Sequence, residues 1–386
     1  MKRTVEGLSY IHGKPVSIEI VDGSISDIVV KERVNDSKFH DVYVAPGLID
    51  NQVNGYNSVG FASTDLTVDG VRSVTRAMWQ FGVTTYLPTV ITSSHERLCE
   101  NFSLLAAATH ETDIGPSIPG FHLEGPYLSP EDGYRGAHNR AWIRVPDWDE
   151  FVKVNEAAEN KILQVTIAPE VEGAMDFIRN CTKNGIIVAI GHHNASTQIV
   201  RRAIDCGAVI ATHLGNGCSN MIHRHNNPLW AQLADDRLMA SIIVDGFHLR
   251  PEEVQVFHKV KGSEHLVIIS DITELAGMPA GEYPWNDDAV VVTPGGMIQY
   301  PDQNVLAGAS FPLSKGVRKM MEFIGCSLED AIRMASTNPA SLNNLNNIGE
   351  LKLGKRADLI LFKIGESELE INKTFIAGKE VYCRDE

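Results

Sequence analysis

Short apolar runs and amphipathic segments alternate along the middle of the chain. The segment from Thr197 to Cys206 carries apolar residues at helical spacing and stops at Gly207, and a second helix is predicted over 251–259. Runs that alternate with helices in this way are typical of parallel strands buried on both faces. Eight such runs occur, at residues 44–50, 83–89, 118–124, 163–169, 186–192, 208–213, 240–245 and 266–271.

Eight parallel strands with helices between them predict an α/β protein built on a (β/α)8 TIM barrel, whose active site lies at the carboxyl ends of the strands. The alternative is an open, doubly wound sheet. We favour the barrel because polar residues end many of the runs and no Gly-x-Gly-x-x-Gly motif follows the first one.

Both ends of the chain have a different pattern, in which apolar and polar residues alternate with a period of two. Residues 15–30 alternate on either side of Asp22-Gly23, which predicts a β-hairpin. Residues 357–377 show the same alternation of apolar and polar residues. Chain termini often lie close together, so the two ends are expected to pair into one small sheet domain.

The length of the chain fits this division. A chain of 386 residues exceeds the usual size of a single hydrophobic core. We expect a small β-sandwich domain made of residues 1–45 and 341–386, and a catalytic barrel over residues 46–340.

The composition is that of an ordinary folded protein and argues against several classes of function. Hydrophobic residues make up 43% and charged residues 22% of the chain, and the net charge is −15. Nucleic acids and membrane surfaces are anionic, so this charge argues against either as a general partner. No run approaches the ~18 apolar residues of a membrane span, and no signal-peptide core follows the first methionine. The six cysteines are scattered without a Cys-x-x-Cys pair, which predicts reduced thiols in a cytoplasmic protein.

Three of the apolar runs end on residues that ligate metals. Glu124 ends the third run, His192 the fifth and His213 the sixth. One carboxylate and two imidazoles leave a coordination position open for water, as in catalytic rather than structural zinc-type sites. The fifth and sixth strands are neighbours in a barrel, so the two histidines are expected side by side. Glu124 is expected to extend toward them across the open end of the barrel, where the carboxyl ends of the strands lie. Each residue taken alone could merely cap its strand, but the joint pattern favours a metal site.

Several of these strand ends belong to longer motifs, and through them the chain resembles the amidohydrolase superfamily from about residue 10 to its end. Within that superfamily it is similar to deacetylases of amino-sugar phosphates. The most specific motif is His122-Leu123-Glu124-Gly125-Pro126. The others are Pro46-Gly47-Leu48-Ile49-Asp50, Gly136-Ala137-His138, Ala168-Pro169-Glu170, Gly191-His192-His193-Asn194-Ala195, Thr212-His213-Leu214, Asp245-Gly246-Phe247-His248, Ser270-Asp271 and Gly354-Lys355-Arg356-Ala357-Asp358-Leu359.

The resemblance implies a function. It implies metal-dependent hydrolysis of the N-acetyl group of N-acetylglucosamine 6-phosphate, which yields glucosamine 6-phosphate and acetate. The small-molecule partner is then an amino-sugar phosphate.

The position after the first barrel strand indicates how many metal ions to expect. Many amidohydrolases have His-x-His there, which completes a site for two metals, whereas this chain has Gln52-Val53-Asn54. Neutral amides are poor ligands for zinc-class metals beside imidazole and carboxylate. We therefore predict one divalent ion per subunit, with zinc as the first expectation and iron, cobalt and manganese as alternatives. Gln52 and Asn54 are expected to line the site or to bond to the bound water.

Two further residues are expected to take part in catalysis. Asp271, at the end of the eighth run, is the natural general base, and the resemblance also assigns it the return of the proton to the leaving amine. The structural alternative for Asp271 is a helix N-cap. His138 matches a family motif and is expected to polarise the acetyl carbonyl or to grip the sugar. Without the motif, a loop histidine such as His138 is more often a solvated side chain.

The resemblance also indicates residues that contact the substrate. His248 matches a substrate-contacting position, and Asn216 with Gly217 matches the amides near the phosphate. Arg224 falls at the family's phosphate-binding arginine, which in relatives comes from the partner subunit of a homodimer; its planar fork of donors suits a phosphate. The alternative for the segment around Arg224 is an exposed polar loop. The segment around Ala309 resembles the loop that covers the acetyl group, although it could equally be a helix entry.

Two other functions remain open. The same fold and metal could act on N-acetylgalactosamine 6-phosphate, on a non-phosphorylated N-acetyl sugar or on another N-acyl amide, because the chain departs from the family around Asn216-Gly217-Cys218 and Arg224. A binding or scaffold protein could keep the barrel without catalysis. The intact set of Glu124, His192, His213 and Asp271 argues against that second reading.

Overall fold

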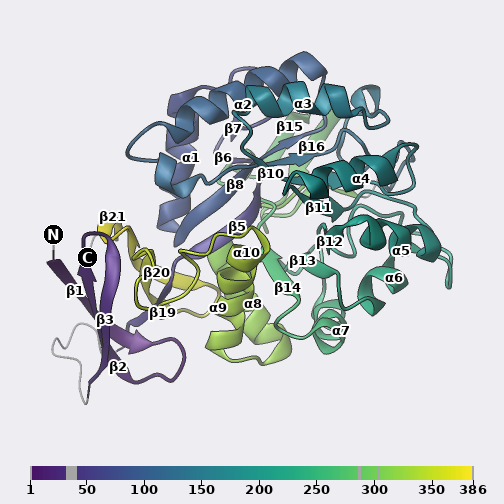
Figure 1. Cartoon of the computed structure of the whole chain (residues 1–386). Coiled ribbons are helices and arrows are strands. Elements are labelled where there is room, and N and C mark those ends of the chain that lie inside the picture. Colours follow the sequence, from purple (N-terminus) through teal and green to yellow (C-terminus); the bar gives the residue numbers. More distant parts are fainter. Residues whose placement is uncertain (1, 32–40, 286–287, 302–304, 385–386) are drawn as a thin grey trace.

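The computed structural model describes residues 2–31, 41–285, 288–301 and 305–384. Residues 1, 32–40 and 385–386 of the predicted small domain lie outside the described residues. Figure 1 shows a large α/β body with a separate sheet beside it that holds both ends of the chain. No helix in the described ranges combines the length and apolar character that crossing a membrane requires.

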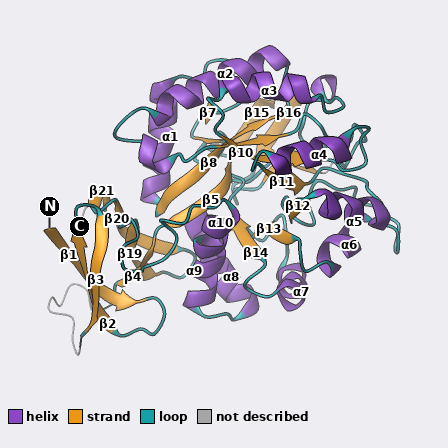
Figure 2. Cartoon of the chain, viewed as in Figure 1, coloured by secondary structure: helices purple, strands orange, loops and turns teal. Residues whose placement is uncertain are grey.

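Eight parallel strands form the sheet at the centre of the large body (Figure 2). Their side chains are almost all buried because helices cover the outer face and the inward side chains fill the interior. In sheet order the strands are β14 (Leu266–Ile269), β13 (Met239–Ile243), β12 (Ala208–Ala211), β11 (Ile187–Ile190), β10 (Ile162–Ile167), β9 (Phe121–Glu124), β8 (Val83–Ile91) and β5 (Leu48–Val53).

The first and last strands of this sheet meet at their carboxyl ends, where the chain forms a barrel. The backbone N–H of Asp271 donates to the carbonyl of Gln52 over 3.1 Å, and that of Asn54 donates to the carbonyl of Ile272 over 2.8 Å. The predicted barrel is therefore confirmed. The same bonds bring the residues that follow β5 beside those that follow β14.

Helices surround the barrel (Figure 2). The predicted helix at Thr197 is α5: the hydroxyl of Ser196 accepts a hydrogen bond from the N–H of Ile199, and Gly207 ends the helix in the left-handed conformation. The predicted helix at 251–259 is α7. The helices are α1 (Val68–Gln80), α2 (His95–Thr109), α3 (Trp148–Ala157), α4 (Ala174–Lys183), α5 (Thr197–Cys206), α6 (Pro228–Ala234), α7 (Pro251–Lys261), α8 (Leu313–Ile324), α9 (Leu328–Ala335) and α10 (Thr337–Leu342), with short 3-10 turns at Gly115–Ser117 and Arg140–Trp142.

Both ends of the chain contribute to one seven-stranded sheet. The predicted hairpin around Asp22-Gly23 is its β2–β3 pair. In sheet order the strands are β21 (Lys379–Cys383), β20 (Leu369–Ile376), β19 (Leu359–Ile364), β4 (Tyr43–Pro46), β1 (Lys2–Ser9), β2 (Pro15–Val21) and β3 (Ser24–Val30).

The first predicted run, 44–50, is divided between the two sheets. Its first part is β4, in the terminal sheet, and its second part is β5, in the barrel. Gly47 lies between them, where a Cβ atom would stand 2.1 Å from the hydroxyl oxygen of Thr84. Only glycine fits this close approach, so the chain can pass directly from one sheet to the other.

Two smaller antiparallel sheets were not predicted. One is the hairpin of β6 (Gly55–Tyr56) and β7 (Val59–Gly60), directly after β5. The other has four strands, which follow β14 and precede α8. They are β15 (Gly281–Trp285), β16 (Asp288–Val292), β17 (Ile298–Tyr300) and β18 (Val305–Leu306).

Candidate active site

A cavity of about 700 Å³ opens at the carboxyl ends of the barrel strands. Its floor holds side chains from five of those ends and from one loop. They are Asn54, Glu124, His138, His192, His213 and Asp271. The four-stranded sheet after β14 supplies another wall of the same cavity, through residues that include Trp285, Gln299 and Leu306. The cavity is thus enclosed by elements that are distant in sequence.

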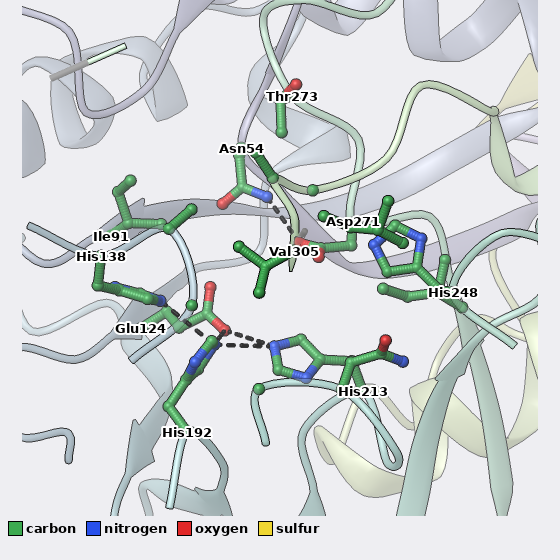
Figure 3. Close-up of a pocket in the computed structure, with 18 of the residues that line it drawn as sticks. Asn54, Ile91, Glu124, His138, His192, His213, His248, Asp271, Thr273 and Val305 are labelled. Carbon is green, nitrogen blue, oxygen red and sulfur yellow. Dashed lines mark hydrogen bonds and ion pairs between the residues drawn. The ribbon is translucent and has the colours of Figure 1, made fainter. Parts of the chain in front are cut away.

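Glu124, His192 and His213 lie together at the bottom of this cavity (Figure 3). The potential ligand atoms of the three side chains all fall within 4.8 Å of one another. His213 Nε2 lies 3.1 Å from Glu124 Oε1 and 3.0 Å from His192 Nε2. All three residues are buried. Reading the strand ends together therefore located a group of residues that can hold a metal ion.

The backbone is in an uncommon conformation where three of these side chains enter the cavity. His192, His213 and Asp271 each stand two residues beyond the last residue of their strand. All three have positive φ, at 53°, 30° and 51° respectively. Left-handed backbone at a residue other than glycine costs about 1 kcal/mol or more and is enriched at functional sites. The fold therefore holds these three side chains in place against a local conformational preference.

A hydrogen bond of His192 indicates which of its nitrogen atoms can bind a metal. His192 Nδ1 lies 2.9 Å from the backbone carbonyl oxygen of Tyr134. A carbonyl only accepts, so Nδ1 carries the hydrogen and Nε2 presents its lone pair toward Glu124 and His213. Glu124 Oε1 lies 3.3 Å from this nitrogen and 3.1 Å from His213 Nε2. One carboxylate and two imidazole nitrogens at these distances form a donor set that fits a divalent cation.

Gln52 and Asn54 turn their amide nitrogens toward carboxylates. Gln52 Nε2 lies 3.1 Å from each carboxylate oxygen of Glu124 and 2.8 Å from Asp271 Oδ1. Asn54 Nδ2 lies 2.8 Å from the same Asp271 oxygen (Figure 3). Burial, followed by the negative charge of Glu124, raises the pKa of Asp271 to about 6. Both amides thus act as hydrogen-bond donors around the candidate base.

His138 reaches the cavity from the loop between β9 and α3. Its Nδ1 lies 2.8 Å from the hydroxyl of Thr92, and its Nε2 lies 3.3 Å from His192 Nε2. Burial, followed by the neighbouring His192, lowers the pKa of His138 to about 3, so the ring is neutral near pH 7. Sequence analysis did not identify Thr92, because a threonine after a strand carries no distinctive signal.

His122, the histidine of the His122-Leu123-Glu124 motif, does not line the cavity. His122 and Glu124 are two residues apart on one strand and so face the same side, the barrel interior. His122 lies below the cavity, with Nε2 2.8 Å from the hydroxyl of Thr166 and Nδ1 3.3 Å from that of Thr89. Burial lowers its pKa to about 4. Neutral His122 and the hydroxyl groups of Thr89 and Thr166 therefore form a hydrogen-bonded layer beneath Glu124.

The residues expected to contact substrate fall into two groups. His248, Asn216 and Gly217 line the cavity, and His248 Nδ1 lies 2.7 Å from Asp245 Oδ2, which fixes the ring. Arg224 does not belong to the lining and is exposed on the loop before α6.

Ala309 is buried just behind the cavity wall, where its N–H donates to the backbone carbonyl of Asp271 over 2.9 Å. Its neighbours Leu306, Ala307 and Gly308 line the cavity instead. The segment therefore borders the site, although Ala309 itself does not reach the cavity.

The charges around the cavity are uneven. Within the described part of the chain, its lining includes the carboxylates of Glu124, Asp271 and Glu274 but no lysine or arginine. Within the described lining, an anionic group of a ligand therefore finds neutral donors such as amides, hydroxyl groups and backbone N–H groups, together with histidines.

Sequence analysis missed the wall formed by β15–β18 and the carboxylate of Glu274. A signal for the wall exists: a β-branched run at 290–292, then Pro294-Gly295-Gly296, then an apolar strand is a hairpin pattern. Nothing in the sequence indicates where that hairpin packs. Glu274 lies in an irregular segment after β14 and has no comparable signal.

Comparison with known proteins identifies relatives that span nearly the whole chain. A model of the amidohydrolase family matches residues 43–381. An N-acetylglucosamine-6-phosphate deacetylase of Vibrio furnissii is 31% identical over 342 residues, which cover 88% of this chain and 83% of that protein. An N-acetylgalactosamine-6-phosphate deacetylase of Escherichia coli O157:H7 is 29% identical over 366 residues, or 94% and 93% of the two chains. The structure is similar to that of a mutant N-acetyl-D-glucosamine-6-phosphate deacetylase from Mycobacterium smegmatis in complex with N-acetyl-D-glucosamine-6-phosphate, with a TM-score of 0.87, 27% identity and coverage of 98% and 99%.

Proposed function

This chain belongs to the amidohydrolase family, and we propose that within it the protein removes the acetyl group of N-acetylglucosamine 6-phosphate to give glucosamine 6-phosphate and acetate. One observation carries the proposal: the buried group of Glu124, His192 and His213 faces Asp271 across one cavity. Amide hydrolysis needs an activated water, a polarised carbonyl and a proton for the leaving amine, and this arrangement provides a residue for each. The named relatives support the choice of substrate.

One divalent ion fits the three ligand residues, because a carboxylate oxygen and two imidazole nitrogens all lie within 4.8 Å of one another. Zinc is the first expectation, with iron, cobalt and manganese as alternatives. Held there, the ion supplies Lewis-acid chemistry, which lowers the pKa of a water molecule and polarises the amide carbonyl. Gln52 and Asn54 direct N–H groups at Glu124 and Asp271, which supports a single ion rather than two.

Asp271 is the proposed proton carrier. Its Oδ1 accepts hydrogen bonds from Gln52 and Asn54, and these bonds stabilise the ionised form that can take a proton from water. Burial beside Glu124 works in the opposite direction and raises its pKa to about 6. A carboxyl poised near the working pH can accept a proton during attack and return it to the amine nitrogen as the C–N bond breaks.

His138 is the proposed group for the acetyl carbonyl or the sugar. In the neutral ring one nitrogen donates and the other accepts. Its Nδ1 pairs with the hydroxyl of Thr92, and its Nε2 faces the cavity near His192. The ring is therefore held in one orientation and can bind an oxygen of the substrate without a net charge.

The phosphate is proposed to lie toward His248, Asn216 and Gly217. A dianion also calls for a cation, and one chain contributes none to the described lining. The exposed guanidinium of Arg224 would meet this need if a second subunit brings it to the cavity, which supports a homodimer with shared sites.

Acetate release from N-acetylglucosamine 6-phosphate tests the function directly. We expect turnover with about one metal equivalent bound per chain, loss of activity on chelation and recovery when zinc or iron returns. Failure to release acetate from this substrate in the metal-loaded protein would falsify the proposal. Two tightly bound ions would instead contradict the roles given to Gln52 and Asn54.

Two other substrates belong in the same assay. The relative from Escherichia coli O157:H7 is named for the galacto sugar, so N-acetylgalactosamine 6-phosphate is one candidate. The absence of lysine and arginine from the described lining favours non-phosphorylated N-acetylglucosamine as another. Relative kcat/KM values for the three compounds rank these functions.

A further inference from the structure

Glu274 is a carboxylate in the cavity to which the proposed mechanism gives no task. It stands three residues after Asp271 and lines the same cavity. Within the described chain its carboxyl has no side-chain hydrogen-bond or ion-pair partner. The side chain keeps some exposure, yet the surrounding protein removes enough water to raise the pKa of Glu274 to about 7. A carboxyl that is desolvated without a partner costs stability, so a role in binding is the natural explanation.

The position of Glu274 is set by the hairpin that follows β5. Its backbone carbonyl accepts a hydrogen bond from the N–H of Ser58 over 2.7 Å. Its carboxyl lies against Gly60, where a Cβ atom would come within 3.1 Å of the carboxyl carbon. Glycine at this position leaves room for the carboxyl. The hairpin thus holds Glu274 on the side of the cavity where Asn54 also enters.

Asn54 presents a second acceptor to the cavity. Its Nδ2 must face Asp271 because a carboxylate only accepts hydrogen bonds. Its Oδ1 therefore points the other way, into the pocket, as Figure 3 shows. That oxygen is buried and has no hydrogen-bond partner among the described residues. Glu274 and Asn54 together form what we call the acceptor pair.

No side chain of the described chain donates a hydrogen bond to either acceptor of the acceptor pair, so the pair favours a ligand that carries hydrogen-bond donors. Sugar hydroxyl groups are such donors, and a carboxylate can accept from two of them at once. The same carboxylate repels a phosphate dianion. The acceptor pair would therefore bind the hydroxyl edge of a sugar and direct its phosphate away, toward His248 and Asn216.

We propose that Glu274, with Asn54, binds ring hydroxyl groups of the amino sugar and is a specificity-determining residue of this site. The inference rests on the proposed function, since it names which part of that substrate the residue contacts. Glu274 takes no part in the proton transfers and contacts neither the ligand residues nor Asp271 by any described hydrogen bond. Its contribution should therefore appear in substrate binding and orientation rather than in the chemical step.

The test compares Glu274→Ala and Glu274→Gln with the wild-type protein on N-acetylglucosamine 6-phosphate. We expect KM to rise about tenfold or more in Glu274→Ala, the effect of losing one hydrogen bond to a charged group, and kcat to stay within about threefold. Glu274→Gln keeps an acceptor oxygen and should raise KM less. Glu282→Ala, at an exposed glutamate on β15 outside the cavity lining, is the matched control and should leave both constants unchanged.

A second measurement separates hydroxyl recognition from a general effect on the pocket. The phosphate ester of N-acetylethanolamine has the acetamide and the phosphate but no ring hydroxyls. Its inhibition constant should be the same in wild type and Glu274→Ala. An unchanged KM for the sugar in Glu274→Ala overturns the inference while the function stands, and so does an equal loss of affinity for both compounds. Absence of acetate release by the wild type overturns the function and this inference with it.

Discussion

Gln52 Nε2 lies 2.8 Å from Asp271 Oδ1, although 219 residues separate the two in sequence. The contact exists because the barrel closes between β5 and β14, which sets the residues after those strands side by side. The same amide nitrogen also reaches Glu124. A single donor therefore links the proposed metal ligand to the proposed base.

Replacing Gln52 with leucine removes that shared donor. We expect metal affinity to fall by about 10- to 100-fold, the usual effect of losing a group that orients a metal ligand, and kcat to fall as well. Asn54→Leu is the matched variant, because Asn54 donates to Asp271 but not to Glu124. It should lower kcat without changing metal affinity. Metal competition with a chelator measures the difference, and equal metal affinities in the two variants would argue against the bridging role of Gln52.

Asp271→Asn removes the proton-transfer group but keeps its shape. Because Asp271 is not one of the three ligand residues, bound metal should remain near one equivalent per chain. kcat should fall about 100-fold or more, since general acid–base catalysis contributes at least that much. Elemental analysis and acetate release on the same sample check both halves of the prediction. A variant that keeps its metal and a near-normal rate would remove Asp271 as the base.

Arg224→Gln tests the phosphate contact and the shared site together. KM for the phosphorylated sugar should rise about 10- to 100-fold, the scale of a lost charge-assisted bond, while the unphosphorylated sugar is unaffected. Arg202→Gln, at an exposed arginine on α5, serves as the control.

Mixed dimers decide which subunit supplies the arginine. When Arg224→Gln chains exchange with Asp271→Asn chains, a site that takes Asp271 from one chain and Arg224 from the other is complete. Activity should then exceed that of either variant alone. No recovery after verified subunit exchange would place Arg224 outside the neighbouring site.

The stability of the protein should depend on pH through Asp50. This side chain is fully buried, its Oδ2 has no partner, and burial raises its pKa to about 7. The raised pKa means that the folded state holds a proton that the unfolded state releases near pH 4. The contribution of Asp50 is therefore complete below about pH 4 and is lost as pH rises toward 7, at a slope of up to ~1.4 kcal/mol per pH unit.

Asp50→Asn should remove this dependence. The stability of the variant relative to wild type should increase between pH 5 and pH 7 and then level off. Denaturant unfolding of both proteins at several pH values measures the difference. A constant difference across that range would mean that Asp50 keeps the same protonation state in the folded and unfolded chains.

The parts of the fold that follow a local rule could be predicted from the sequence. Buried parallel strands read as apolar runs, and their carboxyl ends must meet at one edge, so Glu124, His192 and His213 could be grouped without coordinates. The hairpin at Asp22-Gly23 has a turn type with its own residue signature.

What the sequence could not provide depends on contacts between distant segments. The run at 44–50 looks continuous, yet it serves two sheets, because the division at Gly47 is set by its approach to Thr84. The proton on His192 Nδ1 is fixed by the carbonyl of Tyr134, which belongs to a loop without a regular pattern. Glu274 is placed by Gly60, more than two hundred residues away in sequence.

The order of strands in the terminal sheet also has a consequence for biosynthesis. β4 lies between β1, near the start of the chain, and β19, near its end. The ribosome therefore synthesises all eight barrel strands before it synthesises β19, the strand that pairs with one edge of β4. Until then β4 presents unpaired N–H and C=O groups, the kind of edge that recruits other chains. Pairing of β19 with β4 removes that hazard, so the last strands of the chain complete the terminal sheet and protect it from other chains.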